Sequence, residues 1–370
     1  MIRLTQPYIS SDEIHAMTEV LQSGMLVQGR RVQEFEQNLA TYMQANYVSV
    51  VSSGTAALHL ALAALELGQG DAIIAPSFTF PATVNVVELQ GARPVLVDVT
   101  SGSFNIDPKQ LKDTIKTWTG PEKLKAIIVV HEFGAPADME IIMNIAKEHD
   151  LYVIEDAACA LGTISNGKHV GCLGDIGCFS WHPRKSITTG EGGAIVAKSE
   201  SLHQKINILR NHGIQRLEDG SIDFIVPGFN YRLTEFQAVL GNLQLQRFQY
   251  NLERRKQLVK VYKRELESVE DISLPEMIDG HSWQTFMIVL NSKHERAKVI
   301  KCLAEKGIEA NLGAQAIHMM SYYKDKYHFG LNQFPNAKLF YEKGLALPLH
   351  PLLTEEEITY ISHTLREVLR

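Results

Sequence analysis

The chain has 370 residues, of which 45% are hydrophobic and 21% are charged, and its formal net charge at pH 7 is −6. These values are typical of a globular protein and leave room for two domains with substantial cores. A negative chain lacks the basic face that binding to nucleic acid or to an anionic membrane requires, so we expect neither partner. The first residues contain no basic segment followed by an apolar one, and no apolar run approaches the length of a membrane span, which favours the cytoplasm.

The cysteines agree with a cytoplasmic location. They lack the paired CxxC spacing of zinc sites, and their positions predict no disulfide framework. We therefore interpret them as thiols in a reducing compartment and expect no metal site. They are Cys159, Cys172, Cys178 and Cys302.

The first half of the chain predicts an alternation of helices and short strands. A capped helix begins near Ser10 and ends near Leu21, and residues 32–43 form a second, amphipathic helix. Apolar runs follow at residues 47–51, 72–75, 94–99, 126–130 and 152–154, with helical segments between them at residues 55–67, 81–90, 108–117 and 138–149. This order is typical of a doubly wound, mainly parallel α/β sheet, which binds its ligands at the carboxyl ends of the strands.

A phosphate site is predicted where the first of these strands ends. Ser53, Gly54 and Thr55 follow the apolar run at residues 47–51 and open an Ala-rich helix. Free N–H groups and the dipole at a helix N-terminus suit a phosphate, and glycine allows the backbone to approach it closely. The same triplet is also a good N-cap that binds nothing. A single glycine in place of GxGxxG argues against a dinucleotide-dependent dehydrogenase.

A carboxylate is predicted at the end of another buried strand. Residues 151–154 are apolar without alternation, and Glu155 and Asp156 follow them before a run of small residues. An acid at this position points into the crevice in which open α/β sheets bind ligands. The alternatives for Asp156 are a helix N-cap and a structural ion pair.

Lys185 lies at the centre of the polar loop SWHPRKSITTGEGG, between apolar runs at residues 176–181 and 194–197. Alone it would be interpreted as a surface lysine in a hairpin. Together with Asp156 it predicts pyridoxal 5'-phosphate (PLP). The lysine amine, deprotonated through burial or a nearby cation, would form a Schiff base with the aldehyde, and Asp156 would keep the pyridine nitrogen protonated. At ~3 Å and an effective dielectric of ~20 that attraction is roughly 5 kcal/mol before desolvation, which a neutral residue could not supply.

The second half predicts a smaller α/β domain. A helix at residues 202–210 and a mobile surface loop at residues 217–224 precede a long helix at residues 234–267. We place the domain boundary within that helix, which gives a large PLP-binding domain, residues 1–249, and a small C-terminal domain, residues 250–370. The elements expected in the small domain are a strand at residues 283–290, a helix at 296–306, a short strand at 308–312 and a terminal helix at 355–369.

Six motifs, in order along the chain, resemble one known family. They are SSGTAAL from Ser52, PSFTF from Pro76, EDAA from Glu155, GDIGCFSWHPRK from Gly174, GEGG from Gly190 and GFNYRLTEFQAVLG from Gly228. From Pro7 to His350 the chain resembles the DegT/DnrJ/EryC1/StrS sugar aminotransferases. The resemblance implies fold type I of the PLP-dependent transferases, the aspartate aminotransferase-like fold, with a large mainly parallel α/β domain and a small C-terminal α/β domain.

The resemblance also implies roles for residues around the cofactor. The ring of Phe80 would stack on the cofactor, although a plain core aromatic is the alternative. Thr55 and Ser180 would hold the cofactor phosphate together with Asn230 of the partner subunit, which makes the protein a homodimer with shared active sites. Cys159 occupies the place where most relatives carry a glutamine or histidine that hydrogen-bonds the phenolic oxygen of the cofactor.

The predicted reaction is a transamination. We expect an amino group to pass from L-glutamate to a keto group of a nucleotide-linked deoxysugar, a precursor of cell-surface polysaccharides or glycosides, with Tyr231 and His318 contacting the substrate. Lys185, once released, would move the proton as general acid and base. One alternative is a PLP- or PMP-dependent nucleotide-sugar dehydratase, although such relatives replace the lysine with histidine. The other is a non-catalytic PLP-binding regulator.

Overall fold

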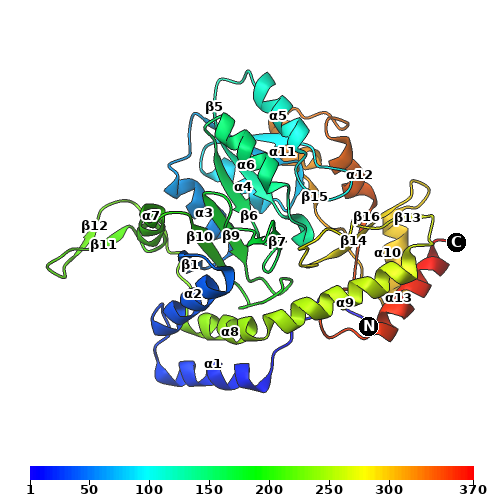
Figure 1. Ribbon diagram of the computed structural model, residues 1–370, viewed down its shortest axis with the longest axis horizontal. Coiled ribbons are helices and arrows are strands. Elements are labelled where there is room, and N and C mark those ends of the chain that lie inside the picture. The colour runs from blue at the N-terminus through cyan, green and yellow to red at the C-terminus, as the bar shows by residue number, and fades with distance from the viewer.

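The computed structural model describes residues 1–370 and is built around one seven-stranded sheet (Figure 1). In spatial order its strands are β1 (Tyr47–Val51), β10 (Gly193–Ala197), β9 (Ile176–Ser180), β6 (Tyr152–Asp156), β5 (Lys123–Val130), β2 (Asp71–Pro76) and β4 (Arg93–Val97). β10 alone runs against the direction of the other six strands, so the sheet is mainly parallel, as predicted. Every apolar run predicted as a strand in this half of the chain lies in this sheet.

Helices cover both faces of the sheet, because adjacent residues of a strand point to opposite sides. Ile73 and Ile74 on β2 are both fully buried, yet they belong to different hydrophobic clusters. The cluster with Ile73 lies under α3 (Gly54–Ala64), α4 (Ala82–Leu89) and α7 (Glu200–Arg210), and the cluster with Ile74 under α5 (Pro108–Thr117) and α6 (Met139–Glu148). None of the helices in the chain is both long and apolar enough to cross a membrane.

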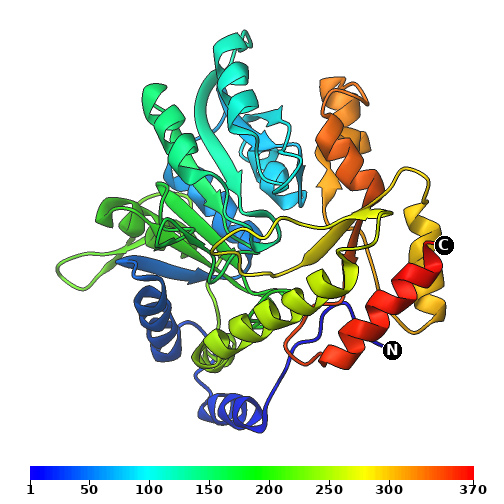
Figure 2. The same cartoon turned by 45° about the vertical axis from the view of Figure 1, so that its right-hand side comes forward.

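The long helix predicted at residues 234–267 is interrupted once. It consists of α8 (Glu235–Gln246) and α9 (Phe248–Leu266), and Arg247 between them has a φ of −100° and a ψ of 4°. The Arg247 guanidinium donates hydrogen bonds of 2.6 Å to the carbonyl of Tyr8 and to the carboxylate of Glu13. These bonds attach α1 (Ser11–Ser23) at the break, and α9 continues from there to the C-terminal part of the chain (Figure 2).

Glu235, the first residue of α8, also fixes the N-terminus of the helix that follows α1. The carboxylate of Glu235 accepts hydrogen bonds of 2.8, 3.0 and 3.0 Å from the N–H groups of Gly29, Arg31 and Val32. It therefore caps α2 (Arg30–Met43), which packs its apolar face against β1. A buried acid at a helix N-terminus accepts hydrogen bonds from the free N–H groups and also interacts favourably with the helix dipole.

The C-terminal part of the chain has its own small core. Helices α9, α10 (Arg296–Glu305) and α13 (Glu355–Val368) pack on an antiparallel sheet of β13 (Ile272–Ser273), β14 (Phe286–Leu290) and β16 (Gly344–Leu347). The strand predicted at residues 308–312 is wrong. Ile308 pairs with Ile2 and Asn311 pairs with Ala346, so single bridges to two different partners replace a continuous ladder. The domain boundary near residue 249 stays a prediction.

One segment of the C-terminal part returns to the large sheet. Strand β15 (Gln315–Ala316) pairs with β3 (Phe78–Thr79), and the ring of Phe340 packs edge-on against Phe78 at 5.6 Å. The helices of this segment are η2 (Ile317–Met319), α11 (Ser321–Tyr327) and α12 (Pro335–Lys343). The remaining short elements are η1 (Glu132–Gly134), β7 (Ile164–Ser165) and β8 (Lys168–His169). This return brings C-terminal residues to the edge of the sheet where ligands are expected.

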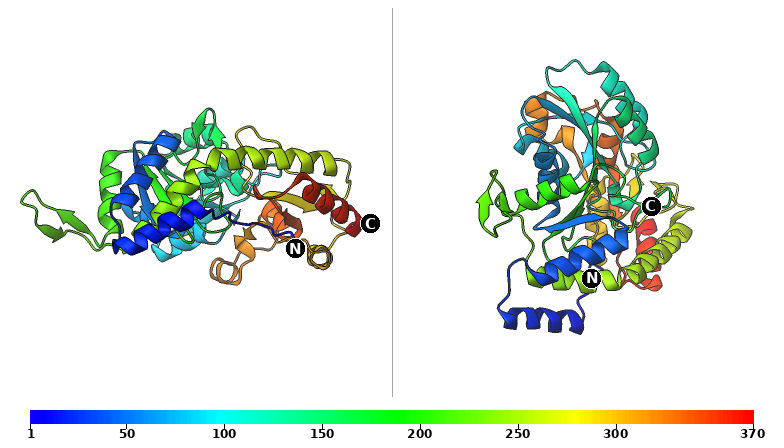
Figure 3. Two further views of the ribbon diagram at one scale, coloured as in Figure 1. Left: turned by 90° about the horizontal axis from the view of Figure 1, so that it is seen from below. Right: turned by 60° about the vertical axis from the view of Figure 1, so that its left-hand side comes forward.

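The segment predicted as a mobile loop at residues 217–224 is part of a β-hairpin. Strands β11 (Ile214–Arg216) and β12 (Ile222–Phe224) pair antiparallel, and the hairpin projects from the body of the molecule at the end away from the C-terminus (Figure 3). Its apolar side chains are exposed, with 65% of Phe224 accessible. The alternation of Ile222 and Phe224 is a strand pattern that the nearby acids and glycine obscure.

The imidazole of His281 is buried as a neutral ring beside the large sheet. Its Nδ1 atom accepts a hydrogen bond of 2.9 Å from the N–H of Trp283, and the ring stacks on the Trp283 indole at 3.7 Å. Protonation would place a hydrogen on the atom that already accepts a bond. Burial lowers the pKa of His281 to about 3, against an ordinary value near 6.5.

We expect His281 to make the protein sensitive to acid. The unfolded chain binds a proton at this residue near pH 6.5 and the folded chain does not, so stability is lost as the pH falls from about 6.5 toward 3, by about 1.4 kcal/mol per pH unit. Denaturant unfolding at a series of pH values should show a flatter acid limb for His281→Asn. The matched control is His15→Asn at an exposed position, which should keep the slope of the unsubstituted protein. Equal slopes in all three proteins would contradict this expectation.

Candidate active site

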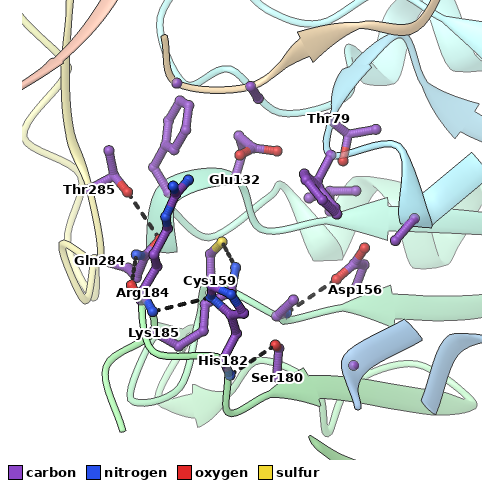
Figure 4. A pocket seen from close by; sticks show the side chains of 18 of the residues that line it. Thr79, Glu132, Asp156, Cys159, Ser180, His182, Arg184, Lys185, Gln284 and Thr285 are labelled. Carbon is purple, nitrogen blue, oxygen red and sulfur yellow. Dashed lines mark hydrogen bonds between the residues drawn. The ribbon is translucent and has the colours of Figure 1, made fainter. Parts of the chain in front are cut away.

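A cavity of about 560 Å³ opens at the carboxyl edge of the large sheet. Its walls come from the loops after β1, β2, β5, β6 and β9 and from C-terminal residues that return to this edge (Figure 4). Seven predicted site residues line it: Gly54, Thr55, Phe80, Asp156, Cys159, Ser180 and Lys185. The cavity has the size and the mixed polar and apolar lining of a small-molecule site. Its position agrees with the rule that open α/β sheets bind ligands at this edge.

Asp156 ends β6 and lies in the wall of the cavity, only 5% exposed. One carboxylate oxygen accepts a hydrogen bond of 2.8 Å from the Thr83 hydroxyl, and the other accepts one of 3.2 Å from the N–H of Ala158. Burial raises the pKa of Asp156, while Thr83, Ala158 and the charge of Lys185 oppose that rise. The carboxyl is held rigidly, and a cationic ligand group beside it would restore the ionised form.

Glu155, the residue before, points to the other face of the sheet and has no exposed surface. Its carboxylate accepts hydrogen bonds from the N–H groups of Gly171, at 2.7 Å, Leu173, at 2.7 Å, and Gly174, at 2.6 Å. The imidazole of His131 lies 2.9 Å from it and completes the set. Four partners for one buried carboxylate fix the end of β6, and with it the position of Asp156.

Lys185 reaches the cavity from the loop after β9, and its Nζ atom lies 2.9 Å from the Sγ atom of Cys159. Burial alone would lower the pKa of this amine, but the acidic groups of Cys159, Asp156 and Glu132 face it and raise the pKa overall. In the chain without cofactor these acidic groups therefore oppose the deprotonation that the sequence predicts for the amine. Lys185 is an ammonium there and must lose a proton before it can attack an aldehyde.

Glu132 belongs to the site although no sequence motif pointed to it. It follows β5 in the segment VHEFG, lines the cavity and is 5% exposed. Burial raises the pKa of Glu132 to about 8, and the neighbouring charge of Lys185 opposes that rise. An acid directly after a buried parallel strand was a usable signal, because it is the same signal that identified Asp156. Other lining residues to which the sequence assigned no role are His182, Arg184, Glu191, Gln284, Thr285 and Asn311.

The N-terminus of α3 forms a cradle at the cavity. The Ser53 side chain caps the helix by accepting a hydrogen bond of 3.0 Å from the N–H of Ala56, which leaves the N–H groups of Gly54 and Thr55 free. A Cβ atom on Gly54 would lie 2.8 Å from the Cβ of Ser180. Glycine is therefore required by the close approach of α3 to the end of β9, and the free donors suit a phosphate.

These groups fit PLP. Asp156 offers an acid for the ring nitrogen, Lys185 an amine for the aldehyde, and the α3 cradle with Thr55 and Ser180 offers donors for the phosphate. The side chain of Phe80 lines the same cavity and is 69% exposed, so it is not a core aromatic, and its stacking on the cofactor stays a prediction.

Three predicted residues lie outside the cavity. His318 has no exposed surface and packs edge-on against Phe334 at 5.0 Å, which does not support a substrate contact. The Tyr231 hydroxyl lies 3.0 Å from Nδ1 of His59 and its ring is stacked on Phe229, so it faces the body of its own chain. Asn230 is exposed beside the hairpin. Within a single chain, none of the three reaches the cofactor site.

The model of the DegT/DnrJ/EryC1/StrS aminotransferase family matches residues 7–366. The chain belongs to this family. Among similar proteins, the spore coat polysaccharide biosynthesis protein SpsC of Bacillus subtilis is 32% identical, over 98% of this chain and 96% of SpsC. The putative sugar aminotransferase Spr1654 of Streptococcus pneumoniae, in its PMP form, is 28% identical with a TM-score of 0.93 over 100% of this chain and 99% of Spr1654. PseC of Helicobacter pylori, an aminotransferase involved in the biosynthesis of pseudoaminic acid, is 27% identical with a TM-score of 0.93 over the same shares.

Membership settles the fold and the cofactor. The fold is that of the PLP-dependent aminotransferases, and Spr1654 has been solved in both a PLP form and a PMP form. PLP is the cofactor of this chain, and the chain is a member of a family of sugar aminotransferases.

We expect Gly54→Ala to weaken cofactor binding on the order of tenfold, because the added Cβ would push α3 away from Ser180. Titration of the cofactor-free protein with PLP, followed by absorbance, gives the dissociation constant directly. The matched control is Gly330→Ala, where an added Cβ meets nothing within 4 Å. An unchanged constant for Gly54→Ala would exclude the cradle as the phosphate site.

Proposed function

We propose that this protein transfers an amino group from L-glutamate to the keto group of a nucleotide-linked deoxysugar in polysaccharide or glycoside precursor biosynthesis. The observation that carries the proposal is one cavity in which Lys185 and Asp156 face each other beside the α3 cradle. The names of two relatives agree with this proposal. SpsC is named as a protein of spore coat polysaccharide biosynthesis, and PseC as an aminotransferase involved in the biosynthesis of pseudoaminic acid.

The bound cofactor supplies an aldehyde that takes up the amino group and a ring that accepts electrons. The chain supplies the rest. Asp156 holds a proton at the ring nitrogen, Lys185 anchors the cofactor and, when displaced, carries a proton between reacting carbon atoms. The apolar part of the wall, including Leu58, Val130 and Phe133, limits access of water to the reacting atoms.

Arg184 is the cation that the proposed substrates require. Its side chain lines the cavity and forms no ion pair within the chain. The carboxylates of glutamate and the phosphates of a nucleotide sugar are both anions, and a chain with a net charge of −6 must attract them locally. We therefore assign Arg184 to the binding of these anions.

We also propose a homodimer with shared sites in the cytoplasm. Asn230 is exposed and outside its own cavity, and large apolar side chains nearby in sequence are exposed, among them Phe224 at 65%. Exposed apolar patches of this kind are typical of interfaces. Asn230 would bind the cofactor phosphate in the cavity of the other chain. The free thiols of all four cysteines agree with a reducing compartment.

Addition of glutamate to the PLP-loaded protein should change the visible spectrum of the cofactor and release one 2-oxoglutarate for each site. Subsequent addition of keto-deoxysugar nucleotides should give an amino sugar that mass spectrometry identifies, and restore the spectrum.

Asp156→Asn should fold normally and slow both half-reactions by orders of magnitude, since the electron sink depends on the charge.

The alternatives give different results in the same experiment. A dehydratase would release a dehydrated sugar without consuming glutamate nitrogen, and a regulator would bind PLP and turn over neither compound. Either outcome, or full activity of Asp156→Asn, would contradict the proposed function.

A mixing experiment tests the shared site. Lys185→Ala and Asn230→Ala chains should regain roughly a quarter of full activity when mixed, because half of the dimers are hybrids with one intact site of two. The matched control mixes Lys185→Ala with Asp156→Asn. Both of these residues line the same chain's cavity, so no hybrid site is intact and no activity should return. Failure of the first mixture, with subunit exchange verified, would refute the shared site.

A further inference from the structure

Glu132 is a buried acid in the cavity wall, and the proposed reaction assigns no role to it. Its side chain is 5% exposed, and neither carboxyl oxygen forms a hydrogen bond with the rest of the chain. The carboxyl oxygens are not sealed off from the cavity, so they are free to pair with a ligand group there, as buried polar groups almost always have a partner. Figure 4 shows Glu132 above Cys159 and Lys185, with Asp156 on the far side of the cavity.

The backbone holds Glu132 in this position. Its N–H donates a hydrogen bond of 2.8 Å to the Asn105 side chain, and its carbonyl accepts one of 2.9 Å from the N–H of Ala135. Phe133 has a positive φ of 57° and Gly134 one of 92°, so the chain turns sharply after the strand. A Cβ atom on Gly134 would lie 3.1 Å from the carbonyl of Cys159. The turn is therefore packed directly against the segment that carries Cys159.

Ionisable groups surround the Glu132 carboxyl. Lys185, Asp156 and Cys159 face it across the cavity or influence its charge. Arg184 also lines the cavity, and the His131–Glu155 pair lies behind the cavity wall. Burial raises the pKa of Glu132 to about 8 in spite of the opposing charge of Lys185. At neutral pH the carboxyl is mainly protonated, and a protonated carboxyl donates one hydrogen bond.

The covalent structure of PLP indicates what this donor meets. Its ring nitrogen is opposite the carbon that bears the aldehyde, and the hydroxyl and the phosphate arm flank that aldehyde on its two sides. With Asp156 at the nitrogen, Lys185 at the aldehyde and the phosphate at the α3 cradle, the hydroxyl oxygen must face the wall opposite the cradle. That wall contains Cys159, which touches Lys185, and Glu132 above it.

We propose that the carboxyl of Glu132 donates a hydrogen bond to the ring hydroxyl oxygen of the bound cofactor. Cys159 is in the same wall, where its Sγ atom accepts a hydrogen bond of 2.9 Å from Lys185 Nζ, but a thiol is a short and weak donor. A carboxyl is longer and a stronger donor, so it supplies the bond that the thiol cannot. Glu132 is in this role a cofactor-binding residue that stabilises the oxygen next to the Lys185 linkage.

The test compares Glu132→Leu, which removes the donor, with Glu132→Gln, which keeps one at similar size. The dissociation constant of PLP and the pH midpoint of the bound cofactor's visible band are measured for each protein. Loss of a hydrogen bond to a charged oxygen should weaken PLP binding roughly ten- to a hundredfold in Glu132→Leu and move the midpoint upward. Glu132→Gln should stay close to the unsubstituted protein on both measures at neutral pH.

The pH dependence of binding gives a second readout that does not depend on the folding of the leucine variant. In the unsubstituted protein PLP binding should weaken as the pH rises through about 8, because an ionised Glu132 no longer donates and repels the oxygen. An amide does not ionise, so this weakening should be smaller in Glu132→Gln. Identical pH profiles in the two proteins would overturn the proposal.

A double variant separates hydrogen bonding from packing. Cys159→Gln places a longer donor in the same wall, and in the Glu132→Leu background it should recover most of the lost PLP affinity and return the midpoint toward its original value. Binding by Glu132→Leu that equals that of the unsubstituted protein, or no recovery in the double variant, would count against the assignment. All of these measurements use PLP alone, so they test Glu132 independently of glutamate and of the sugar in the proposed function.

Discussion

Four donors converge on the Glu155 carboxylate, and the active site depends on that convergence. Three are backbone N–H groups of the segment 171–174 and the fourth is the imidazole of His131. The carboxylate lies at the end of β6 with no exposed surface, so the loss of any one donor would remove a partner from a buried carboxylate, which is costly. Because consecutive strand residues point to opposite faces, fixing Glu155 on one side of the sheet also fixes Asp156 on the other. The acid proposed for the cofactor nitrogen is thus oriented by a network on the opposite face of the sheet.

The sequence predicted the parts of the site that local signals determine. An unbroken apolar strand that ends in acids, a helix that opens with Ser-Gly-Thr, and a lysine in a Gly-closed loop each carry a physical reason for their position, and the structure brings Asp156, Gly54 and Lys185 to one cavity. The same reasoning applied to VHEFG would have found Glu132. Glu132 lies outside all six family motifs, so the resemblance carries no signal for it.

Other features were not predictable because they depend on contacts between distant segments. Residues 308–312, which follow α10, have the pattern of a strand, but Ile308 pairs with Ile2 and Asn311 pairs with Ala346. A local pattern cannot indicate such distant partners. The interruption at Arg247 coincides with its bonds to the N-terminal segment more than two hundred residues earlier. His318 was predicted to contact the substrate, yet tertiary packing against Phe334 removes it from the cavity.

The balance of charge in the cavity explains how an acidic wall can receive an anionic cofactor. Asp156 and Glu132 are both buried within the field of one lysine, and burial raises the pKa of each. Were both ionised, their mutual repulsion would add to the cost of desolvation and oppose a phosphate-bearing ligand. In the proposed complex with the cofactor the two acids would meet different groups. Asp156 would face a protonated ring nitrogen, whereas Glu132 would have no cation of its own once Lys185 is bound to the aldehyde. Ionisation is therefore favourable at one acid and unfavourable at the other, and one cavity can hold a carboxylate and a neutral carboxyl at the same pH.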